Sequence, residues 1–137
     1  MRGGCSCGAV RYRLASEPFD TGWCHCRACQ RISGAPALVF TSVPVGDFIV
    51  ESGGDLIGTT CPVEFGRRRF CTRCGTPLTI AVDFQPETID VVAATLDDPA
   101  AVRPGFHIFY ASRIDWAETD DGLPRYAGFR PDTRGLS

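Results

Sequence analysis

The sequence predicts a mainly β fold of short strands organised around metal sites. Two observations carry this prediction. Runs of β-branched and aromatic residues alternate with turn residues, including 15 glycines and 10 prolines. Seven of the eight cysteines fall into three tight groups. At 137 residues and 44% hydrophobic content, the chain is large enough for a modest core, so we expect a single domain spanning residues 1–137.

The expected elements follow in chain order. Val10, Tyr12 and Leu14 alternate with arginines, which is typical of a half-buried strand. Further strands are expected at residues 37–41, 48–51, 77–82, 89–94 and 107–110, most of them bounded by glycine or proline. One short helix is expected at residues 27–32, and residues 97–102 can add a single helical turn. The tail beyond Gly128 is expected to be loosely ordered.

Composition excludes several classes of function. The net charge is -2 and all 14 basic residues are arginine, so a lysine base or Schiff base is excluded and no basic field attracts nucleic acid. No apolar run approaches the roughly 20 residues that span a bilayer. The N-terminus lacks the apolar segment of a signal peptide, so we expect a cytoplasmic protein. An even cysteine count also allows disulfides, but a reducing compartment favours metal ligation.

The first expected metal site combines two cysteine pairs. Cys71 and Cys74 have the spacing of a zinc knuckle, and the following Gly75 permits a left-handed backbone. Cys5 and Cys7 are two residues apart, which places both thiols on one face of an extended strand. Together the four thiols predict a closed, structural zinc site whose metal contributes to folding.

The second expected site is the group Cys24, Cys26 and Cys29. Three ligands from six residues leave one coordination position for water or substrate, as in a catalytic zinc site. Arg27 and Arg31 lie beside these cysteines and can offset their charge or pair with an anionic substrate.

Alternatives remain for a fourth ligand of the second site. Cys61 is the eighth cysteine, and if it reaches the group, both sites are closed and structural. It can instead be a buried, inert thiol. His25 lies between two ligands and is expected to point outward, whereas His107 in its apolar run is more typical of a core residue.

An ordered set of motifs resembles one family. The set consists of Gly4-Cys5-Ser6-Cys7-Gly8-Ala9-Val10-Arg11-Tyr12, Cys24-His25-Cys26-x-x-Cys29, Arg69-Phe70-Cys71-x-x-Cys74-Gly75-Thr76-Pro77-Leu78, Leu96-Asp97-Asp98-Pro99, His107-Ile108-Phe109, Ser112-Arg113-x-x-Trp116 and Asp121-Gly122-Leu123-Pro124. From about residue 3 to 124, the chain resembles the glutathione-dependent formaldehyde-activating enzyme (GFA) family, also called the CENP-V domain family. The resemblance implies an Mss4-like, or β-tent, fold.

The resemblance also implies two zinc ions per chain. Cys5, Cys7, Cys71 and Cys74 would hold structural zinc, whereas the group at residues 24–29 would hold catalytic zinc with its open position available to the thiol of glutathione. The family pattern does not require a cysteine at position 61.

The activity implied by the resemblance is a carbon–sulfur lyase reaction that joins formaldehyde to glutathione, or reverses that step. The partners are then glutathione or another small thiol and a small aldehyde, with Arg27, Arg31 and His107 as candidate substrate-binding residues. The arginine run at residues 67–69 can also hold carboxylates, although a solvated strand face is the simpler interpretation of that run. The alternative function is a non-catalytic module that binds a thiol or a protein partner and in which both zinc sites are structural.

Overall fold

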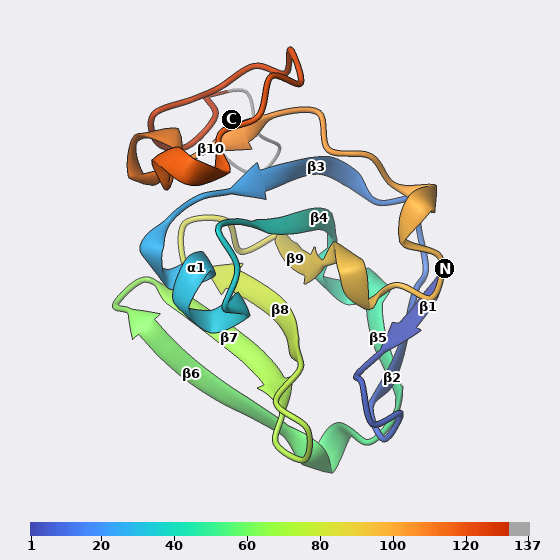
Figure 1. Ribbon diagram of the computed structural model, residues 1–137. Helices are drawn as coiled ribbons and strands as arrows, with labels where there is room; N and C mark the ends of the chain where they lie inside the picture. The colour runs from blue at the N-terminus through green and yellow to red at the C-terminus, as the bar shows by residue number, and fades with distance from the viewer. Residues whose placement is uncertain (132–137) are drawn as a thin grey trace.

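The computed structural model describes residues 1–131 and is mainly β, as the sequence predicts. Its strands form a three-stranded sheet in the order β1-β2-β5 and a seven-stranded sheet in the order β10-β3-β4-β9-β8-β7-β6 (Figure 1). The strands are β1 (Arg2–Gly4), β2 (Arg11–Leu14), β3 (Phe19–Cys24), β4 (Leu38–Pro44), β5 (Phe48–Ser52), β6 (Ile57–Val63), β7 (Gly66–Cys71), β8 (Pro77–Val82), β9 (Thr88–Val92) and β10 (His107–Ile108). All pairings are antiparallel except that of β10 with β3, which is parallel.

One α-helix, α1 (Arg27–Ser33), follows β3, close to the predicted 27–32. Short 3-10 helices make the remaining connections: η1 (Val45–Asp47), η2 (Gly54–Leu56), η3 (Ala93–Thr95), η4 (Pro99–Ala101), η5 (Tyr110–Ser112) and η6 (Asp115–Ala117). The turn expected at residues 97–102 corresponds to η4. No helix in the described part of the chain is long and apolar enough to cross a membrane.

Six of the ten strands in the described residues were predicted and differ from the prediction mainly at their ends, whereas β1, β3, β6 and β7 were not predicted. β8 has the predicted bounds, whereas the strand expected at 89–94 ends at Val92, where η3 begins. The strand expected at 107–110 contains only two residues, because Phe109 adopts a left-handed backbone (φ 53°) that leads into η5. The prediction for the tail falls largely on residues 132–137, which lie outside the described residues.

The buried apolar side chains form two clusters, and each contains thiols. Cys5 and Cys71 pack in the first cluster, beside the fully buried Tyr12. Cys24 and Cys29 pack in the second cluster, beside Phe40. Each cysteine group therefore has two thiols in the hydrophobic core, whereas Cys7 and Cys74 are exposed.

The segment after β9 returns across the molecule to the second cysteine group. β10 pairs with the end of β3, where His107 lies opposite Trp23 and Ile108 opposite Cys24. The backbone N–H of His25 donates to the carbonyl of Ile108 at 3.1 Å. The chain beyond β10 consequently lies over the end of β3 (Figure 1).

Candidate metal centre

Cys5, Cys7, Cys71 and Cys74 come together as the sequence predicts. Their sulfur atoms all lie within 4.8 Å of one another, although the two pairs come from distant parts of the chain. The Sγ–Sγ distances are 3.5 Å between Cys5 and Cys7 and 3.9 Å between Cys7 and Cys71. A tetrahedral ion with Zn–S bonds of 2.3 Å requires sulfurs about 3.8 Å apart. The donor set and its spacing therefore fit zinc.

Backbone turns hold both pairs. At Cys71, the N–H of Gly75 donates to the cysteine carbonyl at 2.7 Å, and the φ of Gly75 is 82°, so the predicted left-handed glycine is confirmed. The prediction that Cys5 and Cys7 lie on an extended strand is wrong. β1 ends at Gly4, and a turn follows in which the N–H of Gly8 donates to the Cys5 carbonyl at 3.1 Å.

Polar contacts favour the thiolate form of Cys5 and Cys74. The backbone N–H of Val10 donates to Cys5 Sγ at 3.2 Å. The hydroxyl of Thr76 lies 3.2 Å from Cys74 Sγ, and this hydrogen bond lowers the pKa of Cys74 to about 5. Because zinc binds the thiolate form of cysteine, such contacts assist metal binding.

The three-thiol group consists of Cys24, Cys26 and Cys29. Cys24 ends β3, and Cys26 caps α1 by accepting a hydrogen bond from the N–H of Cys29 at 3.3 Å. The three sulfurs lie within 4.8 Å of one another. The hydrogen bond between Cys24 and Cys26 lowers the pKa of Cys26 to about 2 and raises that of Cys24. Three negative charges at this separation need a cation, so this donor set also fits zinc.

Cys61 belongs to neither group of thiols. It lies on β6, the edge strand of the large sheet, and is exposed to solvent. The four-thiol and three-thiol groups contain the other seven cysteines. In this structure, Cys61 is neither the buried thiol nor the fourth ligand considered from the sequence.

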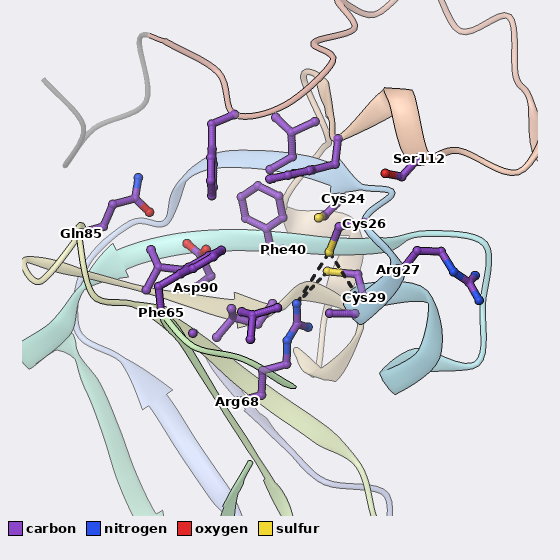
Figure 2. Close-up of a pocket in the computed structure, with 18 residues that line it drawn as sticks. Cys24, Cys26, Arg27, Cys29, Phe40, Phe65, Arg68, Gln85, Asp90 and Ser112 are labelled. Atoms are coloured by element: carbon purple, nitrogen blue, oxygen red, sulfur yellow. Dashed lines mark hydrogen bonds between the residues drawn. The ribbon is translucent and has the colours of Figure 1, made fainter. Parts of the chain in front are cut away.

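The three-thiol group opens onto a cavity of about 330 Å³ (Figure 2). This volume is at the lower end of the range for small-molecule sites. The lining residues are Cys24, Cys26, Arg27, Ala28, Cys29, Phe40, Val63, Phe65, Gly66, Arg68, Ile80, Val82, Gln85, Asp90, Ile108, Phe109, Ser112 and Phe129. None of the four-thiol ligands is among these residues. The two cysteine groups therefore have different surroundings, one beside a ligand-sized space and one apart from it.

One row of residues across the large sheet forms part of the cavity wall. Arg68 on β7 lies opposite Ile80 on β8, and Ile80 lies opposite Asp90 on β9. Directly opposed residues share one face of a sheet, so the three side chains face the same space. The next strand, β4, contributes Ser42, whose hydroxyl donates to Asp90 Oδ1 at 2.6 Å.

Of the three arginines at residues 67–69, Arg68 is the one whose side chain is buried. Its neighbours Arg67 and Arg69 are exposed, whereas Arg68 is only 8% exposed. Its Nη2 donates to Cys29 Sγ at 3.2 Å and lies 4.0 Å from Cys26 Sγ. Its Nη1 is buried and has no hydrogen-bond partner among the described residues. The two interpretations considered for this run, a carboxylate site and a solvated strand face, treated its three arginines alike, whereas strand alternation separates Arg68 from its neighbours.

Asp90 also lines the cavity and is not among the residues predicted from the sequence. Burial raises the pKa of Asp90 to about 6. The cavity therefore contains a carboxyl group that exchanges its proton close to neutral pH.

The arginines predicted from the sequence lie at the edge of the site. Arg27 lines the cavity, is exposed, and donates to the side chain of Gln30. Figure 2 shows its guanidinium pointing away from the cysteines, on the side opposite Phe65. Arg31 is exposed and is not among the residues that line the cavity.

The two histidines are buried and form a hydrogen-bonded chain that ends at Asp121. His25 Nε2 lies 2.8 Å from His107 Nδ1, and His107 Nε2 lies 2.7 Å from Asp121 Oδ2. His25 is 6% exposed, so the expectation that it points outward is wrong. Burial lowers the pKa of His25. His107 is 2% exposed and is not among the residues that line the cavity, as fits the core position considered for it.

Comparisons with known proteins agree with this arrangement. The sequence model of the family described as "Glutathione-dependent formaldehyde-activating enzyme" matches residues 1–112. A protein of Halomonas elongata is 28% identical over 130 residues, which cover 88% of this chain and 81% of that protein. Its name is "Putative glutathione-dependent formaldehyde-activating enzyme". The crystal structure of a Rhodobacter sphaeroides protein superposes with a TM-score of 0.63 at 23% identity, covering 91% of this chain and 99% of the other.

Proposed function

Because the chain belongs to the glutathione-dependent formaldehyde-activating enzyme family, we propose that it is a zinc-dependent carbon–sulfur lyase. Its substrate is the adduct of an aldehyde with glutathione or another small thiol, of the S-hydroxymethylglutathione type. The observation that carries this proposal is the three-thiol group beside a cavity of about 330 Å³.

We assign different roles to the two cysteine groups. Cys5, Cys7, Cys71 and Cys74 hold a structural zinc ion that joins the start of the chain to the turn between β7 and β8. Cys24, Cys26 and Cys29 hold the catalytic zinc ion. Four protein ligands close a zinc site, whereas three leave a position for an exogenous ligand. Bound zinc supplies a position at which a substrate thiol loses its proton near neutral pH.

The chain's own groups set the conditions for the reaction. Arg68 offsets the negative charge of the cysteines through its contact with Cys29. Phe40 and Phe109 form part of an apolar wall that keeps water from the reacting sulfur. In the forward direction, a bond forms between sulfur and the aldehyde carbon, and the carbonyl oxygen takes a proton. Asp90 is a candidate to exchange that proton, because its pKa of about 6 is close to working pH.

Cobalt(II) titration of the metal-free protein tests the assignment of an open site. We expect two bound equivalents, with one set of visible bands changing on addition of glutathione. The exchange of ¹³C-formaldehyde with glutathione, followed by NMR, should then be faster with the zinc protein than without it. Two equivalents with no response to glutathione would instead support a module in which both zinc ions are structural. A spectral response without faster exchange would support a thiol-binding module.

A further inference from the structure

The cavity beside the three-thiol group is lined mainly by hydrocarbon. Its apolar wall combines phenylalanines and aliphatic residues from β4, β6, β8 and β10, from the turn between β6 and β7 and from the chain after β10, and it includes Phe40, Phe65, Ile80, Val82, Ile108 and Phe109. In Figure 2, Phe65 and Gln85 lie on one side of the cysteines and Arg27 on the other. The site therefore has a mainly apolar end, whose polar side chains are Gln85 and Asp90, and a charged, solvent-facing end.

The apolar end continues to the protein surface through a row of aromatic rings. The centroid of Phe84 lies 5.7 Å from that of Phe65 and 5.1 Å from that of Phe129, and Phe129 lies 4.8 Å from Phe109. Phe65, Phe84 and Phe129 are about 40% exposed. Phe109 reaches this row from a left-handed backbone (φ 53°), a conformation that costs energy in a non-glycine residue. Exposed phenylalanines beside a cavity are typical of a site that takes an apolar ligand.

Polar anchoring inside the cavity is sparse but specific. Arg68 Nη1 is buried and has no partner among the described residues, although Nη2 of the same group contacts Cys29. A buried donor without an acceptor costs about 1–3 kcal/mol. A ligand oxygen that accepts a hydrogen bond from Nη1 would remove that cost. Such an oxygen would lie next to the ligand's own sulfur, which approaches the cysteines.

These features exclude two simple occupants of the apolar end. The body of glutathione carries two carboxylates, an ammonium group and two amides, and most of these groups would lose their hydrogen bonds against phenylalanine. The hydroxymethyl group from formaldehyde has only two non-hydrogen atoms and would leave most of the space unfilled.

We propose that the site takes thiohemiacetals of glutathione with aldehydes that carry a hydrocarbon chain or ring. The hydrocarbon lies against Phe40, Phe65 and Phe109, and the hydroxyl oxygen accepts a hydrogen bond from Arg68 Nη1. The charged ends of glutathione lie at the Arg27 side, in water. In the cleavage direction, the carbon–sulfur bond breaks with its electron pair on sulfur, the hydroxyl oxygen forms the aldehyde carbonyl, and the hydroxyl proton ends on sulfur. This inference rests on the proposed function and names its substrate class.

Calorimetric titration of the zinc-loaded protein with unreactive S-alkylglutathiones, from S-methyl to S-hexyl, tests the apolar end. Burying one methylene changes affinity by about three- to fourfold, so we expect the Kd to fall by about that factor per carbon until the space is full. Methyl hexyl sulfide, which has the same hydrocarbon without glutathione, should bind more weakly than S-hexylglutathione. If the two ligands bound equally, the glutathione part would contribute nothing to binding. The hydrocarbon would then belong to a thiol other than glutathione, and the proposal would be overturned.

Two valines of similar exposure give a matched pair of variants. Val63 lines the cavity and is 36% exposed, whereas Val50 lies on β5 in the other sheet and is 37% exposed. Val63→Phe should remove most of the gain in affinity with chain length, and Val50→Phe should preserve it. An unchanged chain-length series in Val63→Phe would contradict the placement of the hydrocarbon.

Arg68→Met tests the polar anchor, with Arg69→Met as the exposed control on the same strand. Arg68→Met should weaken binding of the hexanal–glutathione adduct about tenfold and change binding of S-hexylglutathione, which lacks the oxygen, much less. Equal loss for both ligands would overturn the hydrogen bond. If Arg68→Met does not fold, the comparison of the two ligands in the unaltered protein still decides, because the adduct should bind more tightly.

The two proposals fail in different ways. If glutathione binds and changes the cobalt spectrum but chain length has no effect, the inference about substrate class is wrong and the proposed function stands. If neither glutathione nor any S-alkylglutathione binds, the proposed function fails as well.

Discussion

Replacing Asp90 by asparagine should stabilise the protein at neutral pH. The carboxyl group has an ordinary pKa of 3.8, and burial raises it to about 6 in the folded protein. The folded state therefore holds the proton more tightly than the unfolded state. The stability gained from this proton is present below about pH 4 and is lost as the pH rises from 4 to 6.

The difference between the two pKa values corresponds to about 3 kcal/mol of destabilisation at pH 7. Asparagine has nearly the same shape, cannot ionise, and can still accept the hydrogen bond from Ser42. We expect Asp90→Asn to match the natural protein near pH 4 and to be more stable by up to about 3 kcal/mol at pH 7.

Urea unfolding at several pH values between 4 and 7.5 measures this difference. Both proteins need the same zinc concentration, so that metal-linked effects cancel in the comparison. Asp55→Asn removes an exposed carboxylate and controls for the change in net charge. A difference in unfolding free energy between the two proteins that stays constant with pH would refute the reasoning. It would mean that Asp90 has the same pKa in the folded and unfolded states.

Three further substitutions test the fold and the metal sites. Gly75→Ala places a side chain at φ 82° and should cost about 1–2 kcal/mol by urea unfolding, whereas Gly46→Ala, without a positive φ, should cost little. Tyr12→Phe removes a buried hydroxyl that lies 2.6 Å from a threonine hydroxyl, and should lower the free energy of unfolding by about 1 kcal/mol. Cys74→Ser should lose one zinc ion and the β-type circular dichroism, whereas Cys61→Ser should retain both zinc ions by elemental analysis. Retention of both ions by Cys74→Ser would contradict the structural site.

The strands that the sequence predicts are those with clear alternation or clear turn boundaries. β3 was missed because Asp20, with a positive φ, and Gly22 interrupt its apolar pattern. β6 was missed because it contains Pro62 and polar residues. Proline is tolerated there because β6 is an edge strand, where one row of N–H groups has no partner strand. Edge position and local backbone distortions depend on the assembled sheet, so a periodicity argument does not detect them.

Part of the candidate site can likewise be predicted from the sequence, and part of it cannot. The three-thiol group lies within six residues, so its spacing alone predicts that the sulfurs meet. Arg68 and Asp90 meet the same cavity only because β7, β8 and β9 pair in one particular register. That register depends on the two turns that join these consecutive strands and on the shift in register between Arg69 and Phe70, which the sequence pattern does not specify. The burial of His25 likewise follows from the return of β10 to β3.

The spacing of the two thiol groups along the chain has a consequence for how the protein matures. Cys24, Cys26 and Cys29 emerge from the ribosome together, whereas Cys7 must wait for Cys71, 64 residues later. Closing the longer loop also costs more chain entropy. A nascent chain can therefore bring the three thiols of one group together within a short segment, whereas the four-thiol group becomes complete only when Cys71 and Cys74 meet the start of the chain. Metal uptake at the four-thiol group would then report that the start of the chain has met the turn between β7 and β8, and uptake at the three-thiol group would report the synthesis of a single short segment.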